Sequence, residues 1–426
     1  MRVTEDPAPV APPALPAARR LTPVVLTSAD YRRLWRTGLL YYHAYWFEIV
    51  VAGWVVLTMT GSPLAVGLVG FCRMLPMLVL GLVLGALADR LRETTLLRAV
   101  QVVGMLVAGL LAILFATRQI HVWQICLLTS LFGCGWACDF SARRALIAQL
   151  SGVAGTTSAL SLETMTMQGS KIVATAFGGA VLAFGGPRLA YGWLALVYLT
   201  GVVATSGLRR LPVIARQAET GISLVQLVRS GWTAVVQTPI VRAVLLVTVV
   251  MNLLVFPYQQ IIAVIARDIL GVGAARMGLL AGADGFGAIV VAGLLAVRTR
   301  PVRQGAVFLA GATCVCCLLL VLAISRLYPL SLGAQIVLGA CSGAFGAMQP
   351  VLILNAVPPA VRARAMGILA MAIGMAPLGI LLSGALSAAF GPTLTLLGMA
   401  VLALVLNAGI VARNRILLAG PPAPGE

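Results

Sequence analysis

Four charged side chains interrupt long apolar stretches of this 426-residue chain: Glu48, Arg73, Lys171 and Asp284. A charge at the centre of a bilayer costs at least ~2.5–3.5 kcal/mol on insertion scales, so each is expected to have a function or a partner. At 1.5 Å of helix per residue, all four lie in the central half of a ~30 Å hydrocarbon core. Their charges sum to zero, which indicates two ion pairs. These residues could bind protons or recognise a charged solute. Alternatively, they form static ion pairs that hold helices together.

Apolar helices must position these charges. Hydrophobic residues make up 60% of the chain and charged residues 10%, whereas soluble domains contain about 25% charged residues. This composition excludes a soluble globular enzyme and, for most of the chain, disorder. A spanning helix needs about 20 apolar residues, so the sequence predicts about 12 spans. Their predicted limits are 37–60, 64–87, 95–117, 121–141, 160–185, 189–208, 241–265, 277–297, 304–325, 329–354, 364–389 and 393–412.

The arginines orient the predicted helices. Of the 30 basic residues, 29 are arginines and one is Lys171. The predicted spans leave 23 of them on one side of the membrane and five on the other, with Arg73 and Lys171 inside spans. Basic loops are retained in the cytoplasm. The arginine-rich side and both termini are therefore predicted to be cytoplasmic, in the cytoplasmic (inner) membrane.

The predicted spans form two sets of six. Residues 31–208 and 241–412 are the two predicted six-helix bundles, while 1–30, rich in Pro and Ala, and 413–426 are predicted cytoplasmic tails. The linker 209–240 carries apolar residues at helical spacing, which predicts an amphipathic helix on the membrane surface, with a plain linker as the alternative. Sparse matches at an offset of 206 residues, such as Gly178 with Gly384, support a duplicated arrangement with parallel repeats.

Other functional classes lack the residues they need. The net charge of +18 comes from loop arginines, without a basic surface interleaved with aromatic residues, so nucleic acid is not an expected partner. The eight cysteines and two histidines complete no metal site, and no cofactor is expected. Neither His43 nor His121 has partners at a spacing useful for an enzyme, and a glycine-rich nucleotide loop with lysine is missing.

Residues 85–90, between the second and third predicted spans, read Gly-Ala-Leu-Ala-Asp-Arg. They resemble the loop signature of the major facilitator superfamily, a glycine, three residues, an aspartate and a basic residue. Residues 141–147, 252–258 and 362–368 resemble its drug- and siderophore-export branch, the macrolide-efflux and enterobactin-exporter type. The resemblance covers roughly residues 30–412. The chain departs from the pattern at 92–94, where a glycine and two basic residues are usual, and at 174–175, where antiporters often carry Gly-Pro.

The resemblance implies an all-α integral membrane protein of 12 transmembrane helices, two six-helix bundles around a central cavity. In that fold spans five and eight pack together, so Lys171 and Asp284 are expected to meet between the halves. A carboxylate at Asp89 could hold the bundles in one conformation and release them in the other, with a simple helix cap as the alternative. The expected latch residues are Gly85, Asp89, Arg90, Arg143, Arg144, Arg362 and Arg364. Asp139 and Glu163, near Arg143 and Arg144, are expected to form a structural cluster.

In the superfamily, spans one, four, seven and ten line most of the cavity. These spans offer aromatic and amide side chains together with one or two charges, a combination that suits amphiphilic organic solutes. The candidate cavity residues are Tyr45, Glu48, Asn252, Phe256, Tyr258, Gln259 and Gln349. The candidate residues for proton coupling and the charge network are Glu48, Arg73, Lys171 and Asp284.

These features favour a secondary active transporter that works by alternating access. It is expected to export a small amphiphilic molecule, such as a drug, siderophore or secondary metabolite, in exchange for protons. An importer or facilitator with the same fold is the alternative, and a non-transporting membrane receptor or a membrane enzyme is a remote one. The expected partners are the small-molecule substrate, protons and the lipid bilayer, and the chain is expected to act as a monomer.

Overall fold

The structure, a computed structural model, describes residues 28–90, 92–208, 238–297, 303–357 and 362–414. Within these ranges the backbone alone is described for 78–90, 152–158, 295–297 and 362–364. The predicted amphipathic linker helix, over 209–237, and the tails, over 1–27 and 415–426, lie outside the described residues.

All the secondary-structure elements of the described residues are helices. Ten stretches are long and apolar enough to cross a membrane. One of them, Ala159–Ser206, folds into two passes, and α2 completes twelve, which confirms the predicted fold class. The helices are α1 (Ala29–Thr60), α2 (Pro63–Arg90), α3 (Glu93–Ala116), α4 (Val122–Ser206), α6 (Pro239–Val250), α7 (Ile262–Val264), α8 (Ala274–Val297), α9 (Gln304–Ile324), α10 (Tyr328–Ala356), α11 (Arg362–Ile373), α12 (Ala376–Phe390) and α13 (Pro392–Arg413).

Helix α4 contains three passes although its backbone is helical almost continuously. A straight helix of its 85 residues would be roughly 130 Å long. Instead, the rings of Phe132 and Tyr198 stack with centroids 5.7 Å apart, so the chain has folded back. Gly186 makes the second reversal with a φ of 66°, a left-handed conformation that glycine adopts without steric cost. The predicted spans 160–185 and 189–208 lie on either side of this glycine.

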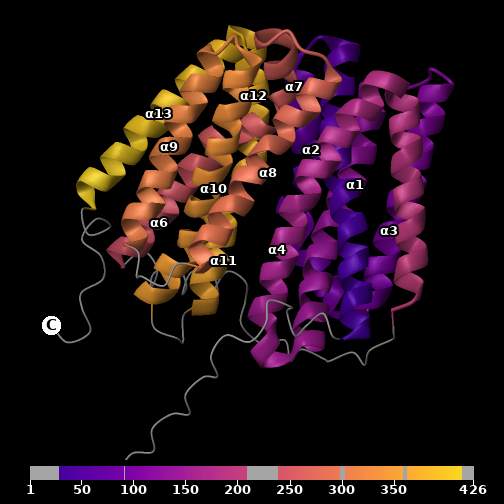
Figure 1. The fold of residues 1–426 in the computed structure, drawn as a ribbon, viewed down its shortest axis with the longest axis horizontal. Coiled ribbons are helices and arrows are strands. Elements are labelled where there is room, and N and C mark those ends of the chain that lie inside the picture. Colours follow the sequence, from indigo (N-terminus) through magenta and orange to yellow (C-terminus); the bar gives the residue numbers. More distant parts are fainter. Residues whose placement is uncertain (1–27, 91, 209–237, 298–302, 358–361, 415–426) are drawn as a thin grey trace, which may run out of the picture.

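The two halves of the chain form two bundles side by side. In Figure 1 the first six passes, coloured indigo to magenta, lie on one side, and the orange to yellow helices lie on the other. Helix α1 begins and α13 ends at the same end of the molecule, which we call the arginine-rich end; it carries Arg33, Arg303 and Arg413. Arg118 and Arg326 lie at the other end, which we call the arginine-poor end.

Two predicted spans are interrupted. The seventh consists of α6, a π-helical turn at Met251–Val255, a 3-10 turn at Phe256–Gln259, α7 and a second π turn at Ile265–Ile269. Pro257 lacks the backbone N–H that a continuous α-helix needs there. The irregular backbone is tolerated because it is buried in protein; Val255, Ile261 and Ile265 are fully buried. The eleventh span is split into α11 and α12 just before Pro377.

Glycines close the two halves against each other toward the arginine-poor end. A Cβ atom on Gly278 of α8 would lie 2.9 Å from the Cα of Gly179 in α4, and one on Gly67 of α2 would lie 2.9 Å from the Cα of Gly384 in α12. Small residues at these positions let helix backbones approach closely. Arg267 adds a hydrogen bond of 2.8 Å from its guanidinium to the Leu57 carbonyl. Contact between the halves therefore closes this end of the molecule.

Adding bulk at this contact should open the arginine-poor end. We expect Gly278→Val to push α8 away from α4, because overpacking of this kind costs about 1–3 kcal/mol. A cysteine at Thr175, introduced after replacement of the eight native cysteines, should then react at least about tenfold faster with an impermeant maleimide added from that side. Gly293→Val is the matched control, since a Cβ atom there meets no described atom within 4 Å and Gly293 lies on the same helix. Equal reactivity in the two variants would contradict the closed contact.

Candidate functional site

The structure brings Lys171 and Asp284 together across the interface between the halves. Lys171 lies in the second pass of α4 and Asp284 in α8, and the Nζ–Oδ2 distance is 2.6 Å. Both residues are buried, with 6% of their surface exposed. The approach depends on glycine: a Cβ atom on Gly282 of α8 would lie 3.1 Å from the Cα of Ile172. Small residues on α8 thus let the two ions meet.

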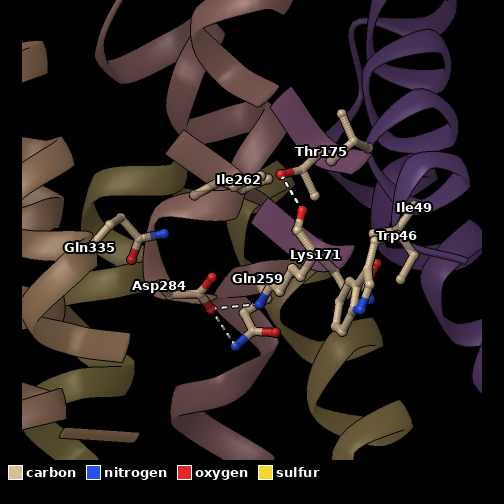
Figure 2. A pocket seen from close by; sticks show the side chains of 11 residues that line it. Trp46, Ile49, Lys171, Thr175, Gln259, Ile262, Asp284 and Gln335 are labelled. Atoms are coloured by element: carbon tan, nitrogen blue, oxygen red, sulfur yellow. Dashed lines mark hydrogen bonds and ion pairs between the residues drawn. The ribbon is translucent and has the colours of Figure 1, made fainter. Parts of the chain in front are cut away.

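Other polar groups surround this bridge (Figure 2). The Lys171 ammonium lies 4.6 Å from the ring centroid of Trp46, within the range of a cation–π interaction. Gln259 donates a hydrogen bond of 3.4 Å to the same Asp284 oxygen that binds Lys171. The second oxygen, Oδ1, is buried and accepts no hydrogen bond from the described residues. The bridge therefore retains an unused acceptor.

The bridge separates two cavities. Trp46, Lys171, Gln259 and Asp284 line both of them. The larger, which we call the chamber, has a volume of about 300 Å³. The smaller, which we call the small pocket, has a volume of about 20 Å³. The chamber is also lined by Tyr45, Trp136, Met167, Gln168 and Ser342, and the small pocket by Ile49, Thr175, Gln260, Ile262 and Gln335.

The position of each cavity follows from the direction of the helices. Gln168 precedes Lys171 on a pass that starts at the arginine-rich end, and Ala288 follows Asp284 on a helix that ends there. The chamber therefore lies on the arginine-rich side of the bridge. Thr175 and Ala281 lie on the opposite side of the bridge along the same helices, so the small pocket faces the closed end.

Aromatic rings form one wall of the chamber. The rings of Tyr45 and Trp136 stack with centroids 4.1 Å apart, and Trp46 meets Tyr45 edge to face at 5.1 Å. These side chains come from α1 and the first pass of α4. An apolar, flat surface next to an ion pair can hold an amphiphilic molecule.

Glu48 and Arg73 form the second buried pair, entirely within the N-terminal half. The ions belong to α1 and α2 and are in direct contact. The Arg73 guanidinium lies 4.7 Å from the Tyr45 ring centroid and donates to the Tyr45 carbonyl at 3.4 Å. Within the described residues the pair lines neither cavity, but Tyr45 connects it to the chamber wall.

A third set of charges lies near the arginine-rich end. Arg143 is 1% exposed and binds both oxygens of Asp139, at 2.6 and 2.8 Å. Its Nε is 3.5 Å from Glu163, which also accepts a 2.6 Å hydrogen bond from Tyr42. Arg144, the next residue, is exposed and lies over the ring of Phe140. The two adjacent arginines therefore have different surroundings.

Several predicted residues do not line the described cavities. Asn252 and Gln349 hydrogen-bond to Thr248, each at 2.9 Å, and Phe256 packs against Phe345 at 5.8 Å between ring centroids. Tyr258 is 2% exposed and belongs to the main hydrophobic core, which includes residues of both halves. Of the predicted cavity residues, Tyr45 and Gln259 line the chamber.

The prediction missed Trp46, Trp136, Gln168, Gln335 and Ser342. Three of these had a signal in the sequence. Gln168 precedes Lys171 by three residues, which places both on one helix face, and Gln335 and Ser342 lie on one face of α10. The two tryptophans had none, because aromatic residues occur throughout the apolar stretches.

The predicted latch falls largely where side chains are not described. Gly85, Asp89 and Arg90 lie in the last turns of α2, and Arg362 and Arg364 in the first turn of α11, all at the arginine-rich end. Their side chains lie outside the described residues, so the latch stays a prediction.

A family model and two relatives of known function match this chain in sequence. A family model described as a transmembrane secretion effector matches residues 21–419. The chain is 25% identical over 380 residues to the multidrug efflux pump Tap of Mycolicibacterium fortuitum, covering 85% of this chain and 90% of that one. It is 28% identical over 159 residues to a staphyloferrin A transporter of Staphylococcus aureus (strain NCTC 8325 / PS 47), a match that spans 37% of this chain and 40% of the relative.

Solved structures share the fold at low sequence identity. A bacterial homologue of the human lysosomal transporter Spinster, inward-facing and unoccupied, superimposes with a TM-score of 0.71 at 14% identity, covering 94% of this chain and all of that one. The nucleoside transporter NupG superimposes with a TM-score of 0.70 at 14% identity, and the match covers 90% of this chain and 99% of the NupG chain. At this identity the match describes the arrangement of helices.

Proposed function

The chain belongs to the transmembrane secretion effector family of the major facilitator superfamily, and from this premise we propose that it exports a small amphiphilic organic molecule in exchange for protons. As a member it is a multi-pass membrane transporter and not an enzyme. The molecule exported, the direction of transport and the coupling ion belong to the proposal.

The Lys171–Asp284 bridge is the observation that carries this proposal. It joins the two halves, it forms the end of the chamber, and the halves close against each other on its far side. In alternating access the halves move relative to one another around a central site. An ion pair in this position is made or broken by the same movement, so binding there can be coupled to the change of conformation.

The name of one relative supports export as the direction. That relative is an efflux pump for many drugs by its name, and another is a transporter of staphyloferrin A. A chamber with an aromatic wall and one ion pair suits amphiphilic solutes. We infer that the solute enters from the arginine-rich side, which we place in the cytoplasm, and that the protein acts as a monomer.

The transport reaction can be tested in inverted membrane vesicles with an imposed pH gradient, acid inside. We expect wild-type vesicles to accumulate amphiphilic dyes from a fluorescent panel of cationic, anionic and doubly charged members, and the accumulation to end when the gradient is collapsed. Asp284→Asn should remove gradient-driven accumulation. Dye movement that only equilibrates, and does so equally without a gradient, would favour a facilitator instead.

Glu48 is the proposed proton-coupling carboxylate in the N-terminal half. It is fully buried and has a single cationic partner among the described residues, Arg73. If Glu48 exchanges the proton, Glu48→Gln should abolish gradient-driven dye accumulation and leave exchange of labelled for unlabelled dye intact, because exchange needs no net proton movement. Purified protein in proteoliposomes allows both measurements. Full gradient-driven accumulation by this variant would exclude the coupling role.

The proposed orientation can be tested at the two ends of α9. Arg303 and Arg326 flank this helix, and both are exposed. In a background without the eight native cysteines, we expect Arg303→Cys to react with an impermeant maleimide only after the cells are opened, and Arg326→Cys to react in intact cells. The positive-inside rule gives this direction. The reverse pattern would place the chamber on the outside.

A further inference from the structure

The Lys171–Asp284 bridge limits the kind of molecule that the chamber can bind. We propose that the substrate carries an ammonium group and an anionic group side by side on one end, and that this head inserts between Lys171 and Asp284. The inference rests on the proposed function and names the substrate class of the same site. The anionic group binds Lys171, the ammonium binds Asp284, and the direct bond between the halves is replaced by two bonds through the substrate.

Charge balance excludes simpler heads. Both ions are buried and bind each other at 2.6 Å. A purely anionic solute that takes Lys171 leaves Asp284 without its partner, and a purely cationic solute that takes Asp284 leaves Lys171 alone. Removing one partner of a buried pair carries a large penalty, because an uncompensated charge remains in a medium of low dielectric constant. A head with both charges leaves neither ion unpaired.

The unused polar atoms around the bridge match the two ends of such a head. On the C-terminal half, Asp284 Oδ1 and Gln335 Oε1 are buried acceptors to which no described residue donates. On the N-terminal half, the indole N–H of Trp46 is a buried donor with no described acceptor, next to the Lys171 ammonium. Two unused acceptors therefore lie on the side of Asp284, together with the unpaired Tyr258 hydroxyl, which can donate or accept. An unused donor lies on the side of Lys171; Figure 2 shows Asp284, Gln335, Trp46 and Lys171.

The size of the head follows from the length of the bridge. Lys171 and Asp284 are in direct contact, so a head whose charges lie far apart would have to separate the helices widely. An α-amino acid, whose two charged groups share one carbon, needs the smallest movement. The stacked rings of Tyr45 and Trp136 then face an apolar or aromatic body in the chamber. The substrate class is an amphiphile with an amino-acid-like head.

Insertion of the substrate head between Lys171 and Asp284 also explains how substrate binding changes the conformation. The bridge separates the chamber from the small pocket, and both cavities share its residues. When the head separates Lys171 from Asp284, the partition opens toward the closed, arginine-poor end. A ligand shifts a conformational equilibrium only as far as its affinities for the two states differ, and here a head with both charges favours the separated state.

Three naphthyl compounds that differ only in the head test this inference. They are 2-naphthylalanine, which carries both charges, 2-(2-naphthyl)ethylamine, which carries the cation, and 3-(2-naphthyl)propionate, which carries the anion. Titration calorimetry with the purified full-length chain at pH 7 should give an affinity for 2-naphthylalanine at least about 100-fold above that for either analogue. Comparable affinities for the three compounds, or no binding of any, would overturn the proposal.

Single substitutions should reverse the preference in opposite directions. Asp284→Asn leaves Lys171 without a counter-ion, so 3-(2-naphthyl)propionate should become the tightest ligand. Lys171→Gln leaves Asp284, so 2-(2-naphthyl)ethylamine should become the tightest. The double variant Lys171→Met/Asp284→Leu, which keeps the site apolar and filled, should bind the three compounds alike, and Gly293→Val should keep the wild-type order. An unchanged order in both single variants would show that the head binds elsewhere.

The binding series and the transport assay can fail separately. Gradient-driven accumulation of dyes without a preference for the doubly charged head would refute this inference and leave the exporter intact. A clear preference with no transport of any dye or of 2-naphthylalanine would refute the exporter and leave the binding site.

Discussion

Lys171→Met alone, or Asp284→Leu alone, will destabilise the protein by about 3–5 kcal/mol, and the double replacement will recover most of that loss. Each single variant strands a charge that is buried between the halves, next to a partner that lay at 2.6 Å. The double variant leaves an apolar pair of similar volume, which often matches or exceeds a buried ion pair in stability. Thermal unfolding and unfolding by sodium dodecyl sulfate measure the four corners of this double-mutant cycle.

Transport measured on the same four proteins separates a structural role from a functional one. Recovery of both stability and dye accumulation in the double variant would mean that the bridge only holds the halves together. Recovery of stability without accumulation is the result we expect, because the bridge binds the substrate head in our proposal. Additive losses in the stability cycle would mean that the two side chains do not interact, and the packing of α4 on α8 would then be wrong.

Arg143→Met will destabilise the protein by about 3–5 kcal/mol, whereas Arg144→Met will change the stability by less than about 0.5 kcal/mol. Arg143 is almost completely buried and compensates Asp139 and Glu163, while its guanidinium also donates to the Leu34 carbonyl and the Thr37 hydroxyl. Without it, two carboxylates remain in a buried site. Arg144 is exposed and lies over the half-buried ring of Phe140.

The adjacent arginine is a close control, since both replacements remove the same side chain one residue apart. Adding Asp139→Leu to Arg143→Met should restore part of the stability, because one of the two stranded carboxylates is then removed. Equal effects of the two arginine replacements would contradict the buried cluster. If Arg144→Met instead reduces transport without loss of stability, the result would support the predicted latch at this end of the molecule.

Much of the fold could be predicted because the bilayer restricts the backbone. Inside hydrocarbon every N–H and C=O must be bonded within the segment, so long apolar stretches become helices. The limits of α3, predicted as 95–117 and observed as Glu93–Ala116, differ by two residues or fewer. The seventh span was harder, because Pro257 permits either a kinked helix or an interrupted one, and the burial of its neighbours decides between them.

The site could be predicted only in part. The cost of burying charge singled out Lys171 and Asp284 before any contact was known. Asn252 and Gln349 were expected in the cavity because they are polar, yet they bond to Thr248 inside the C-terminal half. Trp46 and Trp136 line the chamber although nothing in their spacing distinguishes them from other aromatic residues. Helix rotation, which hydropathy does not report, explains these differences.

By itself, the sequence determined that this chain crosses a membrane in twelve helices and that four charges must be accommodated among them, since apolar length and the cost of buried charge are local properties. The tertiary structure alone decided which polar groups share a cavity and which form hydrogen bonds within one half. It does so through close helix approach, as where Gly282 lets α8 reach Ile172 and thereby sets Asp284 against Lys171. Such an approach depends on the depth and rotation of two helices far apart in the chain, and these are fixed only when the helices pack.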